Sequence, residues 1–216
     1  MKTDWNENNA ILTGEALQAP EFSHASHGED YYLFPVKSLR LSGTEDVINV
    51  MVSRSLLDHF TICVGDRVTV EGEVRSYNNR SGIGSRLVLT LYARQIGPDL
   101  VGVDENRLTL AGSLCRKPVY RRTPLGREIA DLILAVNRRY GRADYLPCIA
   151  WGSLAQQCAE LDTGGCIRLE GRFQSRGYIK VISGGEVQKT AYEVSIMTMQ
   201  VLHLEQSEEP EKSEET

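Results

Sequence analysis

The sequence predicts an all-β protein built from two tandem copies of one small barrel. Three observations support this: short runs of Val, Ile, Leu and Thr, landmarks that repeat at a fixed spacing, and the same order of elements in each copy. Such runs favour strands. The chain has 216 residues, of which 41% are hydrophobic, which is enough for two small domains with their own cores.

The repeat has a spacing of 98 to 99 residues. Landmarks that hold one register indicate a duplicated module. The matching positions are Leu12-Thr13-Gly14 with Leu110-Ala111-Gly112, Pro20 with Pro118, Gly28 with Gly126, Asp46 with Asp144, and Glu71-Gly72 with Glu170-Gly171. We therefore expect a first domain at 1–98, a linker at 99–105, a second domain at 106–204 and a tail at 205–216.

The second copy gives the order of elements. Ser153–Leu161 has helical spacing, with Ser153 as the expected N-cap and Gly164-Gly165 as the stop. Strand patterning occurs at Arg107–Cys115, Glu128–Asn137, Tyr145–Trp151, Cys166–Phe173 and Thr190–Leu202. A helix between strands 3 and 4 is the arrangement of a five-stranded OB barrel, which binds oligonucleotides or oligosaccharides. The first copy repeats this order, with a shorter helix at Ser55–Phe60.

Charge is unevenly distributed along the chain. Residues 1–105 carry 9 Lys and Arg against 15 Asp and Glu, whereas residues 106–204 carry 14 against 8. The last twelve residues, EQSEEPEKSEET, carry 1 against 6 and have no apolar pattern, so this acidic tail is expected to be disordered. A basic segment between acidic ones indicates a polyanionic partner for the second copy.

The remaining composition narrows the class of protein. The five cysteines are odd in number and lack C-x-x-C spacing, so they indicate idle or buried thiols in a reducing compartment. Neither a signal peptide nor a run long enough to span a membrane is evident, and a cytoplasmic protein is expected. The four histidines have no ligand or nucleophile spacing, so we expect no enzyme, no metal and no cofactor.

Aromatic and basic residues of the second copy are the candidate binding residues. The aromatics are Tyr140, Tyr145, Trp151 and Tyr178, and the chosen basic residues are Lys117, Arg121, Arg138, Arg139, Arg172 and Arg176. Rings stack on bases for about 1–3 kcal/mol each, while cations neutralise phosphates. Tyr145 and Trp151 are six residues apart, so in one regular strand they share a face. The alternative is that the rings are core aromatics and the arginines form a solvated surface.

The second copy resembles the OB domain of bacterial single-stranded DNA-binding proteins. The residues that carry the resemblance are Asn106, Leu110 and Gly112, Pro118, Arg121, Thr123 and Gly126, Leu134-Ala135-Val136-Asn137-Arg138, Asp144-Tyr145, Ala150-Trp151-Gly152, Gly165, Glu170-Gly171-Arg172-Phe173, Ser175-Arg176 and Tyr192-Glu193-Val194. The resemblance implies that the four aromatics stack on bases, and that Arg121, Arg172 and Arg176 line the path of the strand. It also implies a homodimer, with four barrels in all.

The first copy departs from this pattern. A shift of 98 or 99 residues places Ser42, Val47, Ser53 and Asn79 where the four aromatics stand, and none of these can stack on a base. We expect this copy to be degenerate and mainly architectural, with a weaker DNA path through Arg75, Tyr77, Arg80 and Arg86. Tyr31, Tyr32 and Phe34 are substitutes if the register slips in loops.

The sequence therefore predicts binding of single-stranded DNA with little sequence preference, in replication, recombination or repair. Replication or repair proteins are further expected partners, although the tail ends in Glu215-Thr216 without the hydrophobic tip that docks partners in the family. Two alternatives stay open. One is an RNA-binding or primosome-type module, and the other is a protein-interaction module whose charges are incidental.

Overall fold

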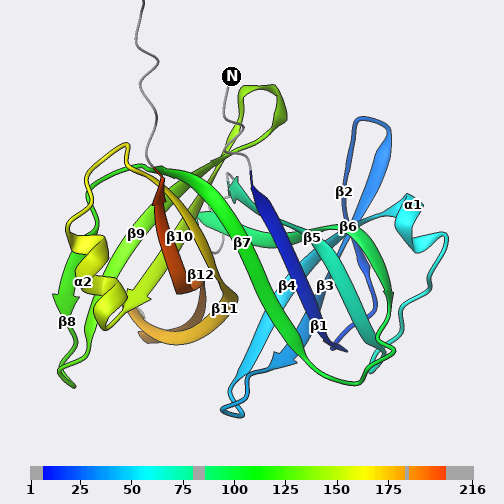
Figure 1. The fold of residues 1–216 in the computed structure, drawn as a ribbon. Helices are drawn as coiled ribbons and strands as arrows, with labels where there is room; N and C mark the ends of the chain where they lie inside the picture. Colours follow the sequence, from blue (N-terminus) through cyan, green and yellow to red (C-terminus); the bar gives the residue numbers. More distant parts are fainter. Residues whose placement is uncertain (1–6, 80–85, 183–184, 203–216) are drawn as a thin grey trace, which may run out of the picture.

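The computed structural model describes residues 7–79, 86–182 and 185–202. These residues form two five-stranded OB barrels whose strands join in one continuous sheet (Figure 1). The predicted fold class, two tandem OB barrels each with a short helix between strands 3 and 4, is confirmed. The tail predicted at 205–216 lies outside the described residues.

The first barrel is closed by two pairings. β1 pairs with β3 in antiparallel fashion, and β4 pairs with β6 in parallel. The short β2 extends β3 as an edge ribbon. The elements are β1 (Asn8–Ala16), β2 (Glu21–Ser26), β3 (Glu29–Leu39), β4 (Glu45–Ser53), α1 (Arg54–Leu57), β5 (Arg67–Asn78) and β6 (Leu87–Pro98).

The second barrel repeats this topology. β7 pairs with β9, and β10 pairs with β12 in parallel, while β8 forms the edge ribbon on β9. Its elements are β7 (Glu105–Leu114), β8 (Val119–Arg122), β9 (Glu128–Asn137), η1 (Arg139–Gly141), β10 (Ala143–Trp151), α2 (Ser153–Ala159), β11 (Cys166–Ile182) and β12 (Gly185–Leu202).

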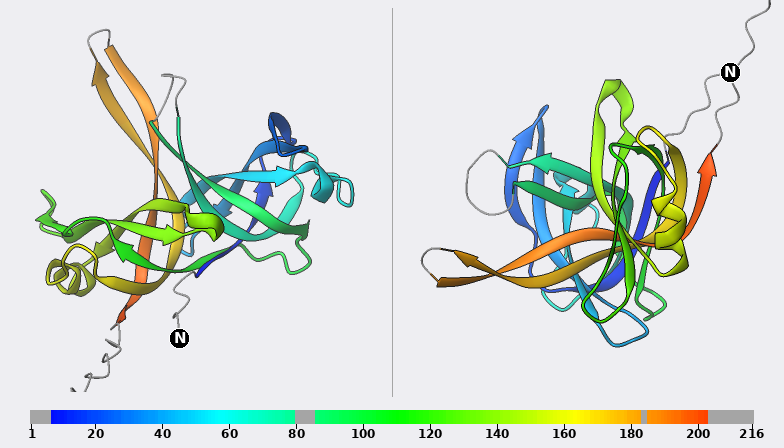
Figure 2. Two further views of the ribbon diagram at one scale, coloured as in Figure 1. Left: turned by 90° about the horizontal axis from the view of Figure 1, so that it is seen from above. Right: turned by 90° about the vertical axis from the view of Figure 1, so that its left-hand side faces the viewer.

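Three details differ from the sequence expectation. The N-cap of α2 is Gly152, at a positive φ of 58°, so Ser153 is already the first helical residue. β11 continues nine residues beyond the expected end at Phe173, and β12 starts five residues before Thr190. Together they form a two-stranded arm that projects from the second barrel (Figure 2).

The repeated glycines mark the points where each barrel closes. A Cβ on Gly14 would lie 2.0 Å from the carbonyl oxygen of Lys37, and one on Gly112 would lie 2.3 Å from that of Ala135. Gly14 lies where β1 meets β3, and Gly112 lies where β7 meets β9, so two backbones approach closely at each position. Both copies have glycine at these positions because any side chain would collide with the backbone of the neighbouring strand.

β1 and β7 join the barrels edge to edge. They pair in antiparallel fashion from Asn8 opposite Leu110 to Thr13 opposite Glu105. β1 is therefore flanked by β5 on one side and by β7 on the other. The linking segment 99–104 is fixed by Arg67, whose guanidinium lies 2.8 Å from Asp99 and 2.6 Å from Asp104.

A side-chain contact, which we call the Ser76 latch, also holds the barrels together. The buried carboxylate of Asp144 accepts a hydrogen bond from the Ser76 N–H at 2.5 Å, and Ser76 Oγ accepts one from the Tyr145 N–H at 2.9 Å. Arg138 binds both carboxylate oxygens of Asp144, and Arg75 binds one of them at 3.0 Å. The negative charge of Asp144, in the second copy, is thus neutralised by Arg138 of the same copy and by Arg75 of the first.

The equivalent Ser175 latch lies at the corresponding positions of the other copy. Asp46 accepts a hydrogen bond from the Ser175 N–H at 3.0 Å, and Ser175 Oγ accepts one from the Val47 N–H at 2.9 Å. Arg40 binds both oxygens of Asp46. The recurrence of Asp46 as Asp144 in the sequence therefore reflects two related contacts across one junction.

The cysteines are all free thiols. Cys148 and Cys158 are buried in the second barrel, whereas Cys63 is exposed. Burial raises the pKa of the Cys158 thiol to about 11. Within the described ranges, no helix is long and apolar enough to cross a membrane.

Candidate nucleic-acid interface

The outward side of β10 carries two exposed aromatic rings. Along this strand Asp144, Leu146, Cys148 and Ala150 are buried, while Tyr145 is 54% exposed and Trp151 is 39% exposed. The two rings share a face, as their even spacing predicts. Neither is a core residue, so the core interpretation is wrong for both rings.

Arg121 lies in the same cross-strand row as Trp151, with Ile129 of β9 between them. β8 and β9 align Arg121 with Ile129, and β9 and β10 align Ile129 with Trp151. The Arg121 Nε lies 2.8 Å from Asp131, and hydrogen bonding to this carboxylate raises the pKa of Arg121. The side chain is half exposed, so its charge remains available to a ligand.

β11 extends the same surface through Arg172, Arg176 and Tyr178. Phe173 points into the core, so the even-numbered residues of this part of β11 point outward. Arg172 lies opposite Ser195, and Ser195 lies beside Ile149 of β10, which joins the two strands into one surface. We call this surface, made of Arg121, Tyr145, Trp151, Arg172, Arg176 and Tyr178, the stacking face.

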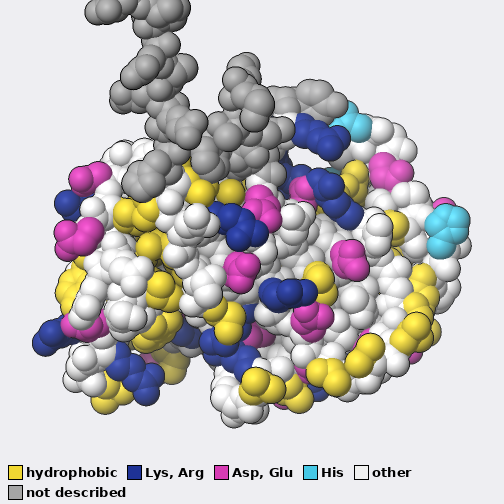
Figure 3. Space-filling model, viewed as in Figure 1, with side chains coloured by type: hydrophobic (Ala, Val, Ile, Leu, Met, Phe, Trp, Pro, Cys, Tyr) yellow, Lys and Arg dark blue, Asp and Glu magenta, His cyan; other side chains and the backbone are white. Residues whose placement is uncertain are grey.

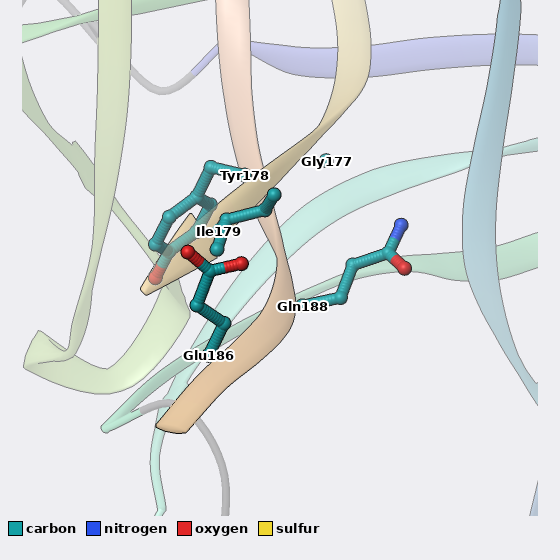
Figure 4. A pocket seen from close by; sticks show the side chains of 5 residues that line it. All are labelled: Gly177, Tyr178, Ile179, Glu186 and Gln188. Carbon is teal, nitrogen blue, oxygen red and sulfur yellow. The ribbon is translucent and has the colours of Figure 1, made fainter. Parts of the chain in front are cut away.

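Tyr178 lies on the projecting arm. It comes after Phe173, where the fourth strand was expected to end, but it is inside β11 and opposite Lys189 of β12. Its ring is 38% exposed and lines a shallow pocket of about 400 Å³. Figure 4 shows the side chains of Tyr178, Ile179 and Glu186 close together, while that of Gln188 points away from them. The arm thus presents a ring with open space beside it.

Two acidic residues of the stacking face were not identified from the sequence. Asp131 pairs with Arg121, and Glu193 lies 2.8 Å from the Gln174 amide and 3.9 Å from the Arg176 Nε. The alternation of inward and outward residues along each strand could have placed Asp131 and Glu193 on this face from the sequence alone. It could not have shown which arginines they contact. The arginines are therefore partly neutralised before any ligand binds.

Arg40 was also missed, because it belongs to the first copy. Burial and the neighbouring Arg40 guanidinium lower the pKa of Arg172, and Asp46 partly offsets this effect. The first barrel thus places an ion pair, Arg40 with Asp46, at the border of the stacking face. This contribution depends on contacts across the junction, which no local pattern reveals.

Four predicted binding residues lie elsewhere or cannot be placed. Arg138 is held in the Ser76 latch, where it also donates to the Ser76 carbonyl at 2.9 Å. Lys117 lies 3.2 Å from Asp162 in the loop after α2. Arg139 is exposed in η1. The backbone of Tyr140 is in η1, but its side chain lies outside the described part of the chain.

A different surface covers the junction of the barrels. In Figure 3, basic and acidic side chains are interspersed over the front of the molecule, where β1 and β7 meet. Arg168 lies 2.7 Å from Glu7, and Arg107 lies 3.1 Å from Glu105. This balance contrasts with the stacking face, where rings and arginines occur together.

The fold and the stacking face define a two-barrel OB-fold protein with a ring-bearing, basic surface on its second barrel. Residues 105–202 match the Single-strand binding protein family. The match covers the second barrel, whereas the first barrel lies outside it.

The chain is also similar to individual proteins. The chain is 38% identical over 80 residues to a single-stranded DNA-binding protein of Halalkalibacterium halodurans, a match that covers 34% of this chain and 48% of the relative. It is 32% identical over 107 residues to one of Oceanobacillus iheyensis, which covers 46% and 63%. The chain thus spans about half to two thirds of the length of these relatives.

One solved structure matches nearly the whole chain. The wild-type single-stranded DNA binding protein from Thermus aquaticus has a TM-score of 0.75 and 20% identity, and the match covers 94% of this chain and 96% of that one. At this identity the match shows the fold. It includes both barrels, so the arrangement of two OB folds in one chain also occurs in a solved structure.

Proposed function

We propose that this protein binds single-stranded DNA with little sequence specificity. The observation that carries the proposal is the stacking face, where three exposed aromatic rings lie among three arginines on the outer side of an OB barrel. Rings stack on any base because every base has a flat face, and arginines bind the phosphates between the bases. Neither contact distinguishes one sequence from another.

The acidic residues of the face refine this mechanism. Asp131 and Glu193 hold Arg121 and Arg176 in place in the free protein. A phosphate that approaches must compete with these carboxylates, so fewer counterions are released than the number of arginines suggests. We therefore expect binding that weakens with salt, but with a slope below that of fully unpaired arginines.

A fluorescence titration tests the proposal. Trp151 is one of two tryptophans, so Trp5→Phe leaves it as the only indole reporter. Added oligo(dT) should quench Trp151, with affinity falling as salt rises. Unchanged fluorescence at low salt would refute single-stranded DNA binding by the stacking face.

A pair of variants tests the assigned residues. Trp151→Ala with Tyr178→Ala should weaken binding by roughly tenfold or more, because each stacked base contributes about 1–3 kcal/mol. Binding should then be followed by the anisotropy of labelled DNA. With a short oligo(dT), Tyr77→Ala in the first barrel should cost much less, and equal losses would contradict the dominance of the second barrel.

Two alternatives are tested by the same titration. An RNA-binding protein would bind oligo(U) more tightly than oligo(dT), and a protein-interaction module would bind neither. We also propose a homodimer with four barrels that acts in replication, recombination or repair in the cytoplasm. Sedimentation equilibrium should then give twice the 24.1 kDa mass of one chain, and a mass of one chain would contradict the dimer.

A further inference from the structure

The outward side of the first barrel carries aromatic rings at positions that the repeat does not predict. The equivalents of Tyr145 and Trp151 on β4 are Val47 and Ser53, which cannot stack on a base. Tyr31 of β3, however, lies directly opposite Ser53. The ring missing from one strand is therefore replaced by a ring on its neighbour.

Tyr92 completes the replacement from the other side of β4. β6 runs parallel to β4, with Tyr92 beside Met51. The centroids of the Tyr31 and Tyr92 rings are 5.9 Å apart, and their hydroxyl groups are 3.3 Å apart. Burial and the hydrogen bond to Tyr31 raise the pKa of Tyr92, so its hydroxyl stays protonated and can donate. The two rings thus form a bridge over β4.

Further rings and cations border this bridge. The His24 ring stacks on Tyr31 at 5.2 Å with an interplanar angle of 19°, and the Arg75 guanidinium lies 6.0 Å from the centre of the Tyr92 ring. Such contacts hold the rings in one orientation before a ligand arrives. A ligand base would then bind without the cost of ordering free side chains.

We propose that His24, Tyr31 and Tyr92 form a second nucleobase-stacking surface, displaced from β4 to the two strands beside it. The inference rests on the proposed function and changes the role of the first barrel from architecture to binding. Its ligand is the same polymer, a single strand that has already engaged the stacking face. The first barrel is therefore altered, rather than degenerate, as a binding module.

The junction supplies a route between the two surfaces. The backbone of Tyr145 is bonded to Ser76 in the Ser76 latch, and Tyr77 follows on β5 with its ring 36% exposed. The Arg138 guanidinium lies 5.4 Å from the centre of the Tyr77 ring. Rings therefore continue from the second barrel, across the latch, towards Tyr92.

Charge on the two surfaces differs. In the first barrel Glu73 pairs with Arg75 and with Arg94, and Arg75 is also bound to Asp144. The charges of these arginines are largely neutralised by carboxylates, so DNA that binds the first barrel would release few counterions. Binding at the second surface should thus depend on stacking and respond little to salt.

The test compares two double variants in the full chain with Trp5→Phe. Tyr31→Leu with Tyr92→Leu removes both rings, whereas Tyr31→Phe with Tyr92→Phe retains them. The Leu pair should shorten the length of poly(dT) occluded per chain and weaken poly(dT) binding by roughly tenfold or more, with a short oligo(dT) bound as before. The Phe pair should behave like the parent chain, and Phe22→Leu on β2 serves as a control for loss of an exposed ring.

The outcomes separate this inference from the proposed function. Absence of Trp151 quenching in the parent chain would refute DNA binding by the stacking face, on which the proposed function rests. Intact quenching with an unchanged occluded length in the Leu pair would overturn only the second surface. Should the Leu pair prove unfolded by its melting curve, ultraviolet cross-linking of oligo(dT) to the parent chain replaces it. Cross-links to Tyr31 or Tyr92 are expected, and cross-links confined to the stacking face would refute the inference.

Discussion

At the scale of single residues, the glycines at the barrel closures have the least freedom to change. Gly112→Ala would place a methyl group 2.3 Å from the Ala135 carbonyl oxygen, so the two strands must separate. We expect a loss of about 2 kcal/mol in the free energy of unfolding, measured by urea denaturation. Gly97→Ala is the matched control, because nothing lies within 4 Å of its Cβ. A Gly112→Ala variant as stable as Gly97→Ala would contradict the steric explanation.

Residue patterns predicted part of the candidate site. The even spacing of Tyr145 and Trp151 gave their common face, because a strand alternates regularly. Arg138 could not be assigned in this way, since its bonding partner Ser76 is 62 residues away in sequence. Tyr31 was named from the sequence as a possible substitute, but its partner Tyr92 was missed for a similar reason. A comparison of equivalent positions cannot detect a ring that has moved to the neighbouring strand.

At the scale of elements, the arm of β11 and β12 differs from the part of β11 within the barrel. From Cys166 to Gly171, β11 is paired with both β7 and β12, but beyond this point β12 is its partner. Strands flanked on one side open more easily. Hydrogen–deuterium exchange should therefore be at least tenfold faster at 177–182 than at 166–171. Equal rates would indicate that a further contact protects the arm.

The sequence predicted the length of a strand correctly where one face of that strand is buried. β9 matches its expected bounds, because its apolar residues alternate against the core. β2 and β8 were missed, since their residues are almost all exposed and give no alternation. The outer half of β11 was missed for the same reason. A ribbon whose side chains are nearly all exposed leaves little trace in the sequence.

At the scale of the whole molecule, the Ser76 latch fixes one barrel against the other. Asp144→Ala would leave Arg138 and Arg75 without their shared carboxylate. The side chains of these two arginines are each 18% exposed, and that of Asp144 is buried. We expect a loss of about 3 kcal/mol in the free energy of unfolding, measured by urea denaturation. Asp46→Ala should cost less, because Arg40 is the one ion-pair partner of its carboxylate among the described residues. The opposite order would contradict the assigned difference between the two latches.

The pairing of β1 with β7 has a consequence for synthesis of the chain. β1 is made first, yet one of its edges is covered only when Glu105–Leu114 has left the ribosome. Until then the nascent first barrel exposes unpaired N–H and C=O groups along Asn8–Thr13, which can recruit the same strand of another chain. Rapid emergence of β7 closes this edge within the same molecule. Tandem linkage thereby also protects the chain from aggregation while it is being made.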